Sequence, residues 1–225
     1  MNFERVITEA TPLFLEGMKI TVYVSVVSIL IGMALGLVAC LMKLSHNPVL
    51  RGIAGFYIWI IRGTPMIVQA YFFYFGLTAP MRLILDGFTM SVMDAALITV
   101  SLNAGAYLAE IFRSGIQAVP KGQTEAARSL GLGQSRTMVK VVLPQAVRIS
   151  LPPMINQFII TIKDTSILSV LGLGDLTNKA KIYASATYTS FATYVYVGCF
   201  YLVIISVLML LSRHLERSLN YAGKN

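Results

Sequence analysis

The chain has 225 residues, of which 56% are hydrophobic and 12% charged, and its mean hydropathy is +0.72. Soluble proteins carry about 25% charged residues, so this composition excludes an ordinary soluble domain and indicates an integral membrane protein. The length has room for a handful of spans of about 20 residues each, and we expect one transmembrane domain over residues 1–225. The net charge of +8 comes mainly from basic residues outside the spans, and no nucleic-acid partner is expected.

The first predicted span, Ile20–Met42, is uncharged and rich in Val, Ile and Leu. Gly32 and Gly36 have the small-xxx-small spacing that lets a second helix approach closely. The segment before this span contains three glutamates in place of a basic region, which is unlike a cleavable targeting signal. We therefore expect the first span to be retained.

The second apolar region, Ile53–Leu77, is interrupted by Arg62–Gly63–Thr64–Pro65. Proline has no backbone N–H and glycine is conformationally free, so this tetrapeptide predicts a helix that breaks and restarts. The third and fourth spans, Val92–Phe112 and Ser150–Leu171, are too polar for helices that face only lipid. Their polar side chains are Asn103, Tyr107 and Glu110 in the third span, and Asn156, Gln157, Lys163 and Asp164 in the fourth. A fifth span, Ala192–Leu211, completes an all-α membrane fold of about five helices.

The basic residues predict the orientation of these spans. On the five-span arrangement, 11 of the 18 basic residues fall on one side and five on the other, while Arg62 and Lys163 lie within spans. Cytoplasmic loops carry the excess of Lys and Arg, so the richer side is expected to be cytoplasmic. The N-terminus is then outside and the C-terminus inside.

A charged loop of about residues 114–149 separates the third and fourth spans on the expected cytoplasmic side. We expect a short helix that starts at Gln123 or Thr124 and has Glu125 in its first turn, where the helix dipole favours an acid. Gly131 is placed to end this helix. The loop is interpreted either as a solvated connection or as a helical element that fits a groove on a partner protein.

A second short helix is predicted to start near Ser135 in the same loop. Its apolar residues Met138, Val141 and Val142 recur at helical spacing, which gives it an amphipathic pattern. Leu143–Pro144 is expected to redirect the chain into the fourth span.

The loop resembles that of a known family, the inner-membrane permease subunits of ABC importers. Their pattern is EAA, three residues, glycine, nine residues, an aliphatic residue, any residue and LP. Glu125, Ala126, Ala127, Gly131, Val141, Leu143 and Pro144 fill every position of this pattern. The resemblance covers about residues 10–220. Further segments look like the polar amino-acid branch, which includes histidine-, arginine-, glutamine- and cystine-type permeases, and these segments are Arg62–Pro65, Ser101–Asn103 with Tyr107 and Glu110, Gly122–Gln123 and Lys163–Ser166.

The resemblance implies a permease that carries a polar amino acid across a bacterial inner membrane. It implies a second permease subunit, either another copy or a related paralogue, a pair of cytoplasmic ATPase subunits and an extracytoplasmic solute-binding protein. The chain has no GxxxxGK phosphate loop followed by Ser or Thr, so ATP and magnesium are expected on the ATPase subunits and no cofactor in this chain. Cys40 and Cys199 lie in apolar runs without a partner at metal-ligand spacing, so neither a metal site nor a catalytic site is expected.

Polar residues inside the spans are candidates for a translocation path, since ionisable groups in a membrane tend to face protein or water. The candidates are Arg62, Asn103, Tyr107, Glu110, Asn156, Gln157, Lys163 and Asp164. For each, a structural role competes with this interpretation. Glu110 could form an ion pair with Arg113, Arg62 could reach the membrane interface, and the amides could join neighbouring helices.

Two other classes of function compete with an importer subunit. A secondary transporter or channel would need no docking loop and usually contains an internal repeat, which is not visible in this sequence. An intramembrane enzyme would need a nucleophile with its base, or a metal set, and neither His46 nor His214 has such spacing.

Overall fold

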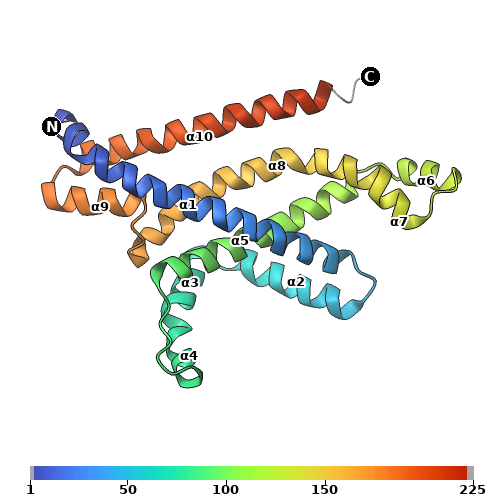
Figure 1. The fold of residues 1–225 in the computed structure, drawn as a ribbon, viewed down its shortest axis with the longest axis horizontal. Coiled ribbons are helices and arrows are strands. Elements are labelled where there is room, and N and C mark those ends of the chain that lie inside the picture. The colour runs from blue at the N-terminus through green and yellow to red at the C-terminus, as the bar shows by residue number, and fades with distance from the viewer. Residues whose placement is uncertain (1–2, 222–225) are drawn as a thin grey trace.

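Long helices that run side by side make up most of the computed structural model, which describes residues 3–221 (Figure 1). No strand occurs within these residues, so the predicted all-α fold is confirmed. The α-helices are α1 (Phe3–Leu44), α2 (Pro48–Gly63), α3 (Met66–Tyr71), α4 (Thr78–Ile84), α5 (Val92–Gln117), α6 (Lys121–Ser129), α7 (Gln134–Thr137), α8 (Leu143–Asp164), α9 (Leu176–Thr187) and α10 (Ser190–Tyr221). Two π-helical turns, η1 (Phe72–Gly76) and η2 (Met138–Val142), and a 3-10 segment, η3 (Thr165–Leu171), join some of them.

Four helices in the described part of the chain are long and apolar enough to cross a membrane: Phe3–Leu44, Val92–Gln117, Gln134–Leu171 and Ser190–His214. The second predicted span corresponds to the pair formed by α2 and the segment Met66–Ile84, which are bent by 106° relative to each other. Four of the predicted spans are therefore found, and the second is broken as expected and makes a fifth span if the bent pair is counted as one. Helix α1 begins earlier than the predicted first span, and the helix that contains the fourth span begins at Gln134.

Close packing between α1 and α5 forms the centre of the bundle. A Cβ atom at Gly32 would lie 2.9 Å from Cβ of Ala104, and one at Gly36 would lie 2.9 Å from the carbonyl oxygen of Gly105. Real Cβ contacts are longer, so both positions require glycine if the helices are to keep this separation. The small-residue spacing in the first span has the packing role that was predicted.

The break between α2 and α3 is stabilised by the side chain of Gln69. Pro65 has no N–H, so the carbonyl of Ile61, four residues earlier, loses its usual helical partner. The Gln69 amide nitrogen donates to this oxygen at 2.7 Å and also to Thr64, at 2.8 Å to the hydroxyl and 3.1 Å to the carbonyl. Gln69 is buried, and its role was not predicted from the sequence.

The two ends of the bundle differ in structure. At one end, which we call the loop end, lie the turn between α1 and α2 and the segment from α6 to η2 (Figure 1). At the opposite end α9, which was not predicted, packs beside the start of α1. Asp175 caps α9 by accepting from the backbone N–H groups of Thr177 and Asn178, and the Leu176 N–H donates to the Thr21 hydroxyl at 3.1 Å.

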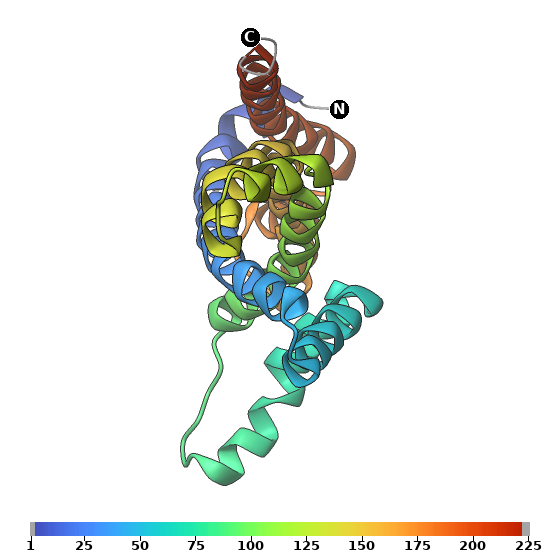
Figure 2. The ribbon, with the colours of Figure 1, turned by 90° about the vertical axis from the view of Figure 1, so that its right-hand side faces the viewer.

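Helix α4 projects away from the long helices, whereas α3 packs against α5 and η3. Figure 2, a view from the loop end, shows α4 extending to one side of the bundle. Leu83 and Ile84 on α4 are 89% and 76% exposed in the single chain.

Lys224, which was counted on the basic side of the membrane, lies outside the described residues, as does the side chain of Arg217.

Candidate functional site

Helix α6 carries the EAA residues at the loop end and finishes in a Schellman motif. The Gly131 N–H donates to the carbonyl of Arg128 at 2.9 Å, and the Leu132 N–H donates to that of Ala127 at 3.1 Å. Gly131 has φ +83°, a left-handed conformation that is costly for residues with a Cβ atom. The prediction that Gly131 ends this helix is confirmed.

The predicted start of this helix was wrong. The helix begins at Lys121, directly after Pro120, and Pro120 provides no side-chain cap. Glu125 therefore lies in the second turn and not in the first. The reason is that Pro120 occupies the N-cap, where its missing N–H leaves no helical hydrogen bond unmade, so the helix can begin directly after it.

The predicted redirection at Leu143–Pro144 was also wrong. Residues from Gln134 to Leu171 form one continuous helical span, and Pro144 lies in the first turn of α8. The π-helical turn η2 directly precedes this proline, and the Leu143 N–H bonds to the Met138 carbonyl, five residues back. Such a wider turn accommodates the backbone that the proline ring would otherwise disrupt.

Helix α6 has one buried side and one solvent-exposed side. Ala127 is 5% exposed, whereas Glu125 and Ala126 are exposed. Leu130, at the end of α6, is 84% exposed. The EAA helix is thus anchored by Ala127 and displays an apolar leucine and an acid on a surface that another protein can contact.

The described side chains bring three of the predicted path residues together in a groove of about 400 Å³ between α2, α5 and α8. Arg62 from α2 lies over the ring of Tyr107 on α5, with its guanidinium carbon 5.0 Å from the ring centre. Glu110 lies one turn further along α5. This carboxylate accepts from Arg113, whose Nε is 3.0 Å away, so the predicted local ion pair is present in the wall of the groove.

Helix α8 forms the other wall of the groove through Ile149 and Pro153. Asn156 and Lys163 follow these residues at helical spacing and are exposed, so they continue the same face of α8 towards its far end. Gln157 is turned into the bundle and is 4% exposed.

Asn103 is also buried, at 8% exposed, one helical turn before Tyr107 on α5. Asn103 and Gln157 therefore have the burial expected of residues that join helices. Asn156 does not, because its side chain remains on the open face of α8.

The adjacent residues Lys163 and Asp164 mark a change in helix type. Helix α8 ends at Asp164, and the 3-10 segment η3 continues from Thr165. The Lys163 carbonyl accepts from the Ser166 hydroxyl at 2.6 Å. Within the described residues neither Lys163 nor Asp164 forms an ion pair closer than 4.0 Å.

The contact between the two walls of the groove, where Gly115 on α5 meets Ser150 on α8, was not predicted from the sequence. A Cβ atom at Gly115 on α5 would lie 1.9 Å from the hydroxyl oxygen of Ser150 on α8. Both residues line the groove. A glycine within a polar helix was the available signal, but its partner lies 35 residues away and could not be identified from spacing.

Comparisons with known proteins agree with this architecture. Residues 28–221 match the family described as binding-protein-dependent transport system inner membrane component. The arginine transport system permease protein ArtQ of Bacillus subtilis is 39% identical over 92% of this chain and 93% of its own length. The glutamine transport system permease protein GlnP of Escherichia coli strain K12 is also 39% identical, with the same coverage.

Solved structures show the same fold. A chain of an amino acid ABC transporter, crystallised with histidines, superposes with a TM-score of 0.90 at 38% identity, covering 97% of this chain and 99% of that one. A chain of an inward-facing methionine ABC transporter has a TM-score of 0.74 at 19% identity, covering 92% of this chain and 96% of that one, which shows the fold alone. The chain has the EAA spacing and a broken second span, and the family model matches most of its length. It therefore belongs to the binding-protein-dependent transport system inner membrane components.

Proposed function

We propose that this chain is the permease subunit of an ATP-driven ABC importer that carries a polar amino acid across a bacterial inner membrane. The observation that carries the proposal is the 39% identity with arginine and glutamine permeases over nine-tenths of the chain. An extracytoplasmic binding protein delivers the solute, and two ATPase subunits hold ATP and magnesium. A second permease subunit, either a copy or a paralogue, completes the path.

The loop end is proposed to face the cytoplasm and to dock on an ATPase subunit. The basic residues support this orientation, because those of the α1–α2 turn and of the loop between α5 and α8 belong to the richer side of the membrane. The exposed face of α6, with Glu125, Ala126 and Leu130, supplies the contact. Gly131 and Pro144 set its geometry through the Schellman turn and the wide π-helical turn.

The groove lined by Arg62, Tyr107 and Glu110 is proposed as one half of the translocation path. Its lining includes the polar residues Arg62, Glu110 and Ser114, and its aromatic residue, Tyr107, remains 37% exposed in the single chain. A transport path usually forms where two related helical units meet, so the exposed face of α8 with Asn156 and Lys163 would meet the second permease subunit. Glu110, paired with Arg113, supplies a negative charge for a zwitterionic solute, and Arg62 supplies the positive charge.

Uptake by a reconstituted complex tests this proposal. The permease is inserted into proteoliposomes with its ATPase subunits and binding protein, and uptake of labelled arginine and glutamine is measured with and without internal ATP. We expect uptake of at least one of them to require both ATP and the binding protein. Uptake that proceeds equally without ATP would instead support a secondary transporter and overturn the proposal.

A further inference from the structure

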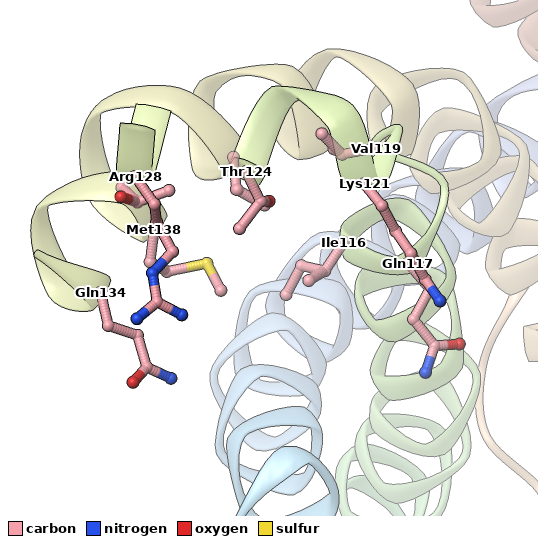
Figure 3. A pocket seen from close by; sticks show the side chains of 10 residues that line it. Ile116, Gln117, Val119, Lys121, Thr124, Arg128, Gln134 and Met138 are labelled. Atoms are coloured by element: carbon pink, nitrogen blue, oxygen red, sulfur yellow. The ribbon is translucent and has the colours of Figure 1, made fainter. Parts of the chain in front are cut away.

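Two cavities lie next to each other at the loop end. The first has a volume of about 510 Å³ and lies between the end of α5, α6 and α7 (Figure 3). Its base is apolar and includes Ile116, Val119 and Met138. In Figure 3, Arg128 and Gln134 lie on one side of this base, and Lys121 and Gln117 lie on the other.

The charged side chains that line this first cavity are all positive. Lys121 and Arg128 line it, and no acidic side chain is among its ten lining residues, all of which are described. Neither cation takes part in an ion pair closer than 4.0 Å within the described residues. Gln117, Thr124 and Gln134 add uncharged hydrogen-bonding groups. The cavity therefore favours an anionic group with several acceptor oxygens.

The second cavity, of about 500 Å³, is almost entirely apolar and lies between α1, α5 and α8. Its lining includes Met33, Leu37, Phe112 and Val147, and no charged residue. Met33 is nine residues before Met42, so at 1.5 Å per residue the cavity reaches roughly 14 Å into the span. This depth is close to half of the roughly 30 Å hydrocarbon layer.

Ile116 lines both cavities, so the cationic one and the apolar one are separated by about one side chain. Together they form an amphipathic site, with its charged part beyond the end of α5 and its apolar part within one leaflet. A small soluble anion would fill only the first cavity. A protein segment would have to bend from the solvent into the hydrocarbon layer.

We propose that the two cavities bind an anionic phospholipid of the cytoplasmic leaflet. The headgroup phosphate lies between Lys121 and Arg128, and an acyl chain lies along Leu37, Phe112 and Val147. Basic pockets at the cytoplasmic ends of membrane helices recognise anionic lipids by this combination of charge and depth. The proposal depends on the proposed orientation of the loop end, but not on the identity of the transported solute.

Such a lipid would link the membrane to the EAA helix. Arg128 belongs to α6, while Ile116 belongs to α5 and Val142 to η2, so one headgroup contacts all the elements that position the loop. Binding is expected to restrict movement of α6 relative to the spans. The lipid thereby becomes a structural component of the surface that docks the ATPase.

Native mass spectrometry of the assembled transporter measures this binding directly. The complex is purified in mild detergent and titrated separately with dioleoyl phosphatidylglycerol and dioleoyl phosphatidylcholine. We expect retention of the anionic lipid and little retention of the zwitterionic one. The double substitution of Lys121→Gln and Arg128→Gln should weaken binding of the anionic lipid by about fivefold for each cation removed.

A matched control uses two cations of the same loop that line neither cavity, Arg136 and Lys140. Their double substitution to glutamine removes the same charge and should change lipid retention by less than about twofold. An equal loss in both double variants would mean that only the net charge of the loop matters. That result would overturn the proposed site.

The apolar half is tested by filling the second cavity. Ala34 lines it and is exposed, so Ala34→Phe should reduce retention of the anionic lipid without burying a polar group. Leu202→Phe, on the exposed face of α10, serves as the control and should have no effect. Unchanged retention in Ala34→Phe, or equally tight binding of soluble glycerol 3-phosphate, would contradict a lipid and leave only a free anion. Retention of both lipids to the same extent would also contradict it.

Discussion

Removing the side-chain amide of Gln69 should destabilise the bend between α2 and α3. This nitrogen donates to the Ile61 carbonyl and to two oxygens of Thr64, and the residue is 6% exposed. In Gln69→Leu the Ile61 oxygen loses the donor that replaces the N–H that Pro65 lacks. A buried acceptor left without a partner costs about 1–3 kcal/mol, and we expect a loss of this size.

Gln69→Glu should be more damaging than Gln69→Leu. A carboxylate in place of the amide would face three oxygen acceptors without a proton to donate, unless it became protonated inside the bundle. Thr64→Val is the matched control, because it leaves both carbonyl contacts of Gln69 in place and removes only the Thr64 hydroxyl, which accepts from Gln69 and donates to the Ile60 carbonyl. From the most to the least stable, the expected order is wild type, Thr64→Val, Gln69→Leu and Gln69→Glu.

Thermal unfolding of the detergent-solubilised protein measures these differences. For a chain of this size each kcal/mol shifts Tm by about 2–4 °C, so Gln69→Leu should lower Tm by about 2–12 °C. Uptake should fall as well, because Arg62, which lies over Tyr107 in the groove, is at the end of α2 next to the bend. A Tm for Gln69→Leu equal to that of Thr64→Val would refute the role of the amide.

Three further predictions concern other parts of the molecule. Gly131→Ala should lower the stability of the left-handed turn by about 1–2 kcal/mol and reduce solute-stimulated ATP hydrolysis. Unchanged hydrolysis would show that this turn has no role in coupling. Burial raises the pKa of Asp175 to about 6, above the unfolded value of about 3.9, so the wild type should lose stability as pH rises from about 4 to 6. Asp175→Asn keeps a capping side chain, so its Tm should fall less over that range, and an equal fall would exclude this carboxyl as the cause. Glu110→Gln and Asp164→Asn should reduce uptake while the yield of assembled complex stays normal, whereas a parallel loss of both would assign them a structural role.

Local features that act within one or two helical turns could be predicted from the sequence. The glycines at positions 32 and 36 predicted a close helix contact, and α5 provides that contact through Ala104 and Gly105. The spacing of Glu110 and Arg113 offered an ion pair as one of two interpretations of Glu110, and this pair is present. Both features could be read from the spacing of residues along a single helix.

Contacts that depend on distant elements could not be predicted. Arg62 meets Tyr107 because α2 packs beside α5, where the Tyr57 hydroxyl donates to the Leu102 carbonyl, and no pattern within either helix identifies this pairing. Pro144 did not redirect the chain, because a π-helical turn absorbs its effect and whether such a turn forms depends on packing. Helix α9 was missed although Asp175 is a strong capping residue, because a search for apolar spans does not detect a short amphipathic helix.

Thiol labelling of the loop end in sealed vesicles is the most direct test of the account. In a chain with Cys40 and Cys199 replaced by alanine, Leu130→Cys and Leu83→Cys are compared, since these leucines are 84% and 89% exposed. We expect an impermeant reagent to label position 130 only from the cytoplasmic side, and the ATPase subunits to block that labelling. Position 83 should be labelled only from outside and should be unaffected by the ATPase. Labelling of both positions from the same side, or equal labelling of position 130 with and without the ATPase, would contradict the proposed docking of the EAA loop.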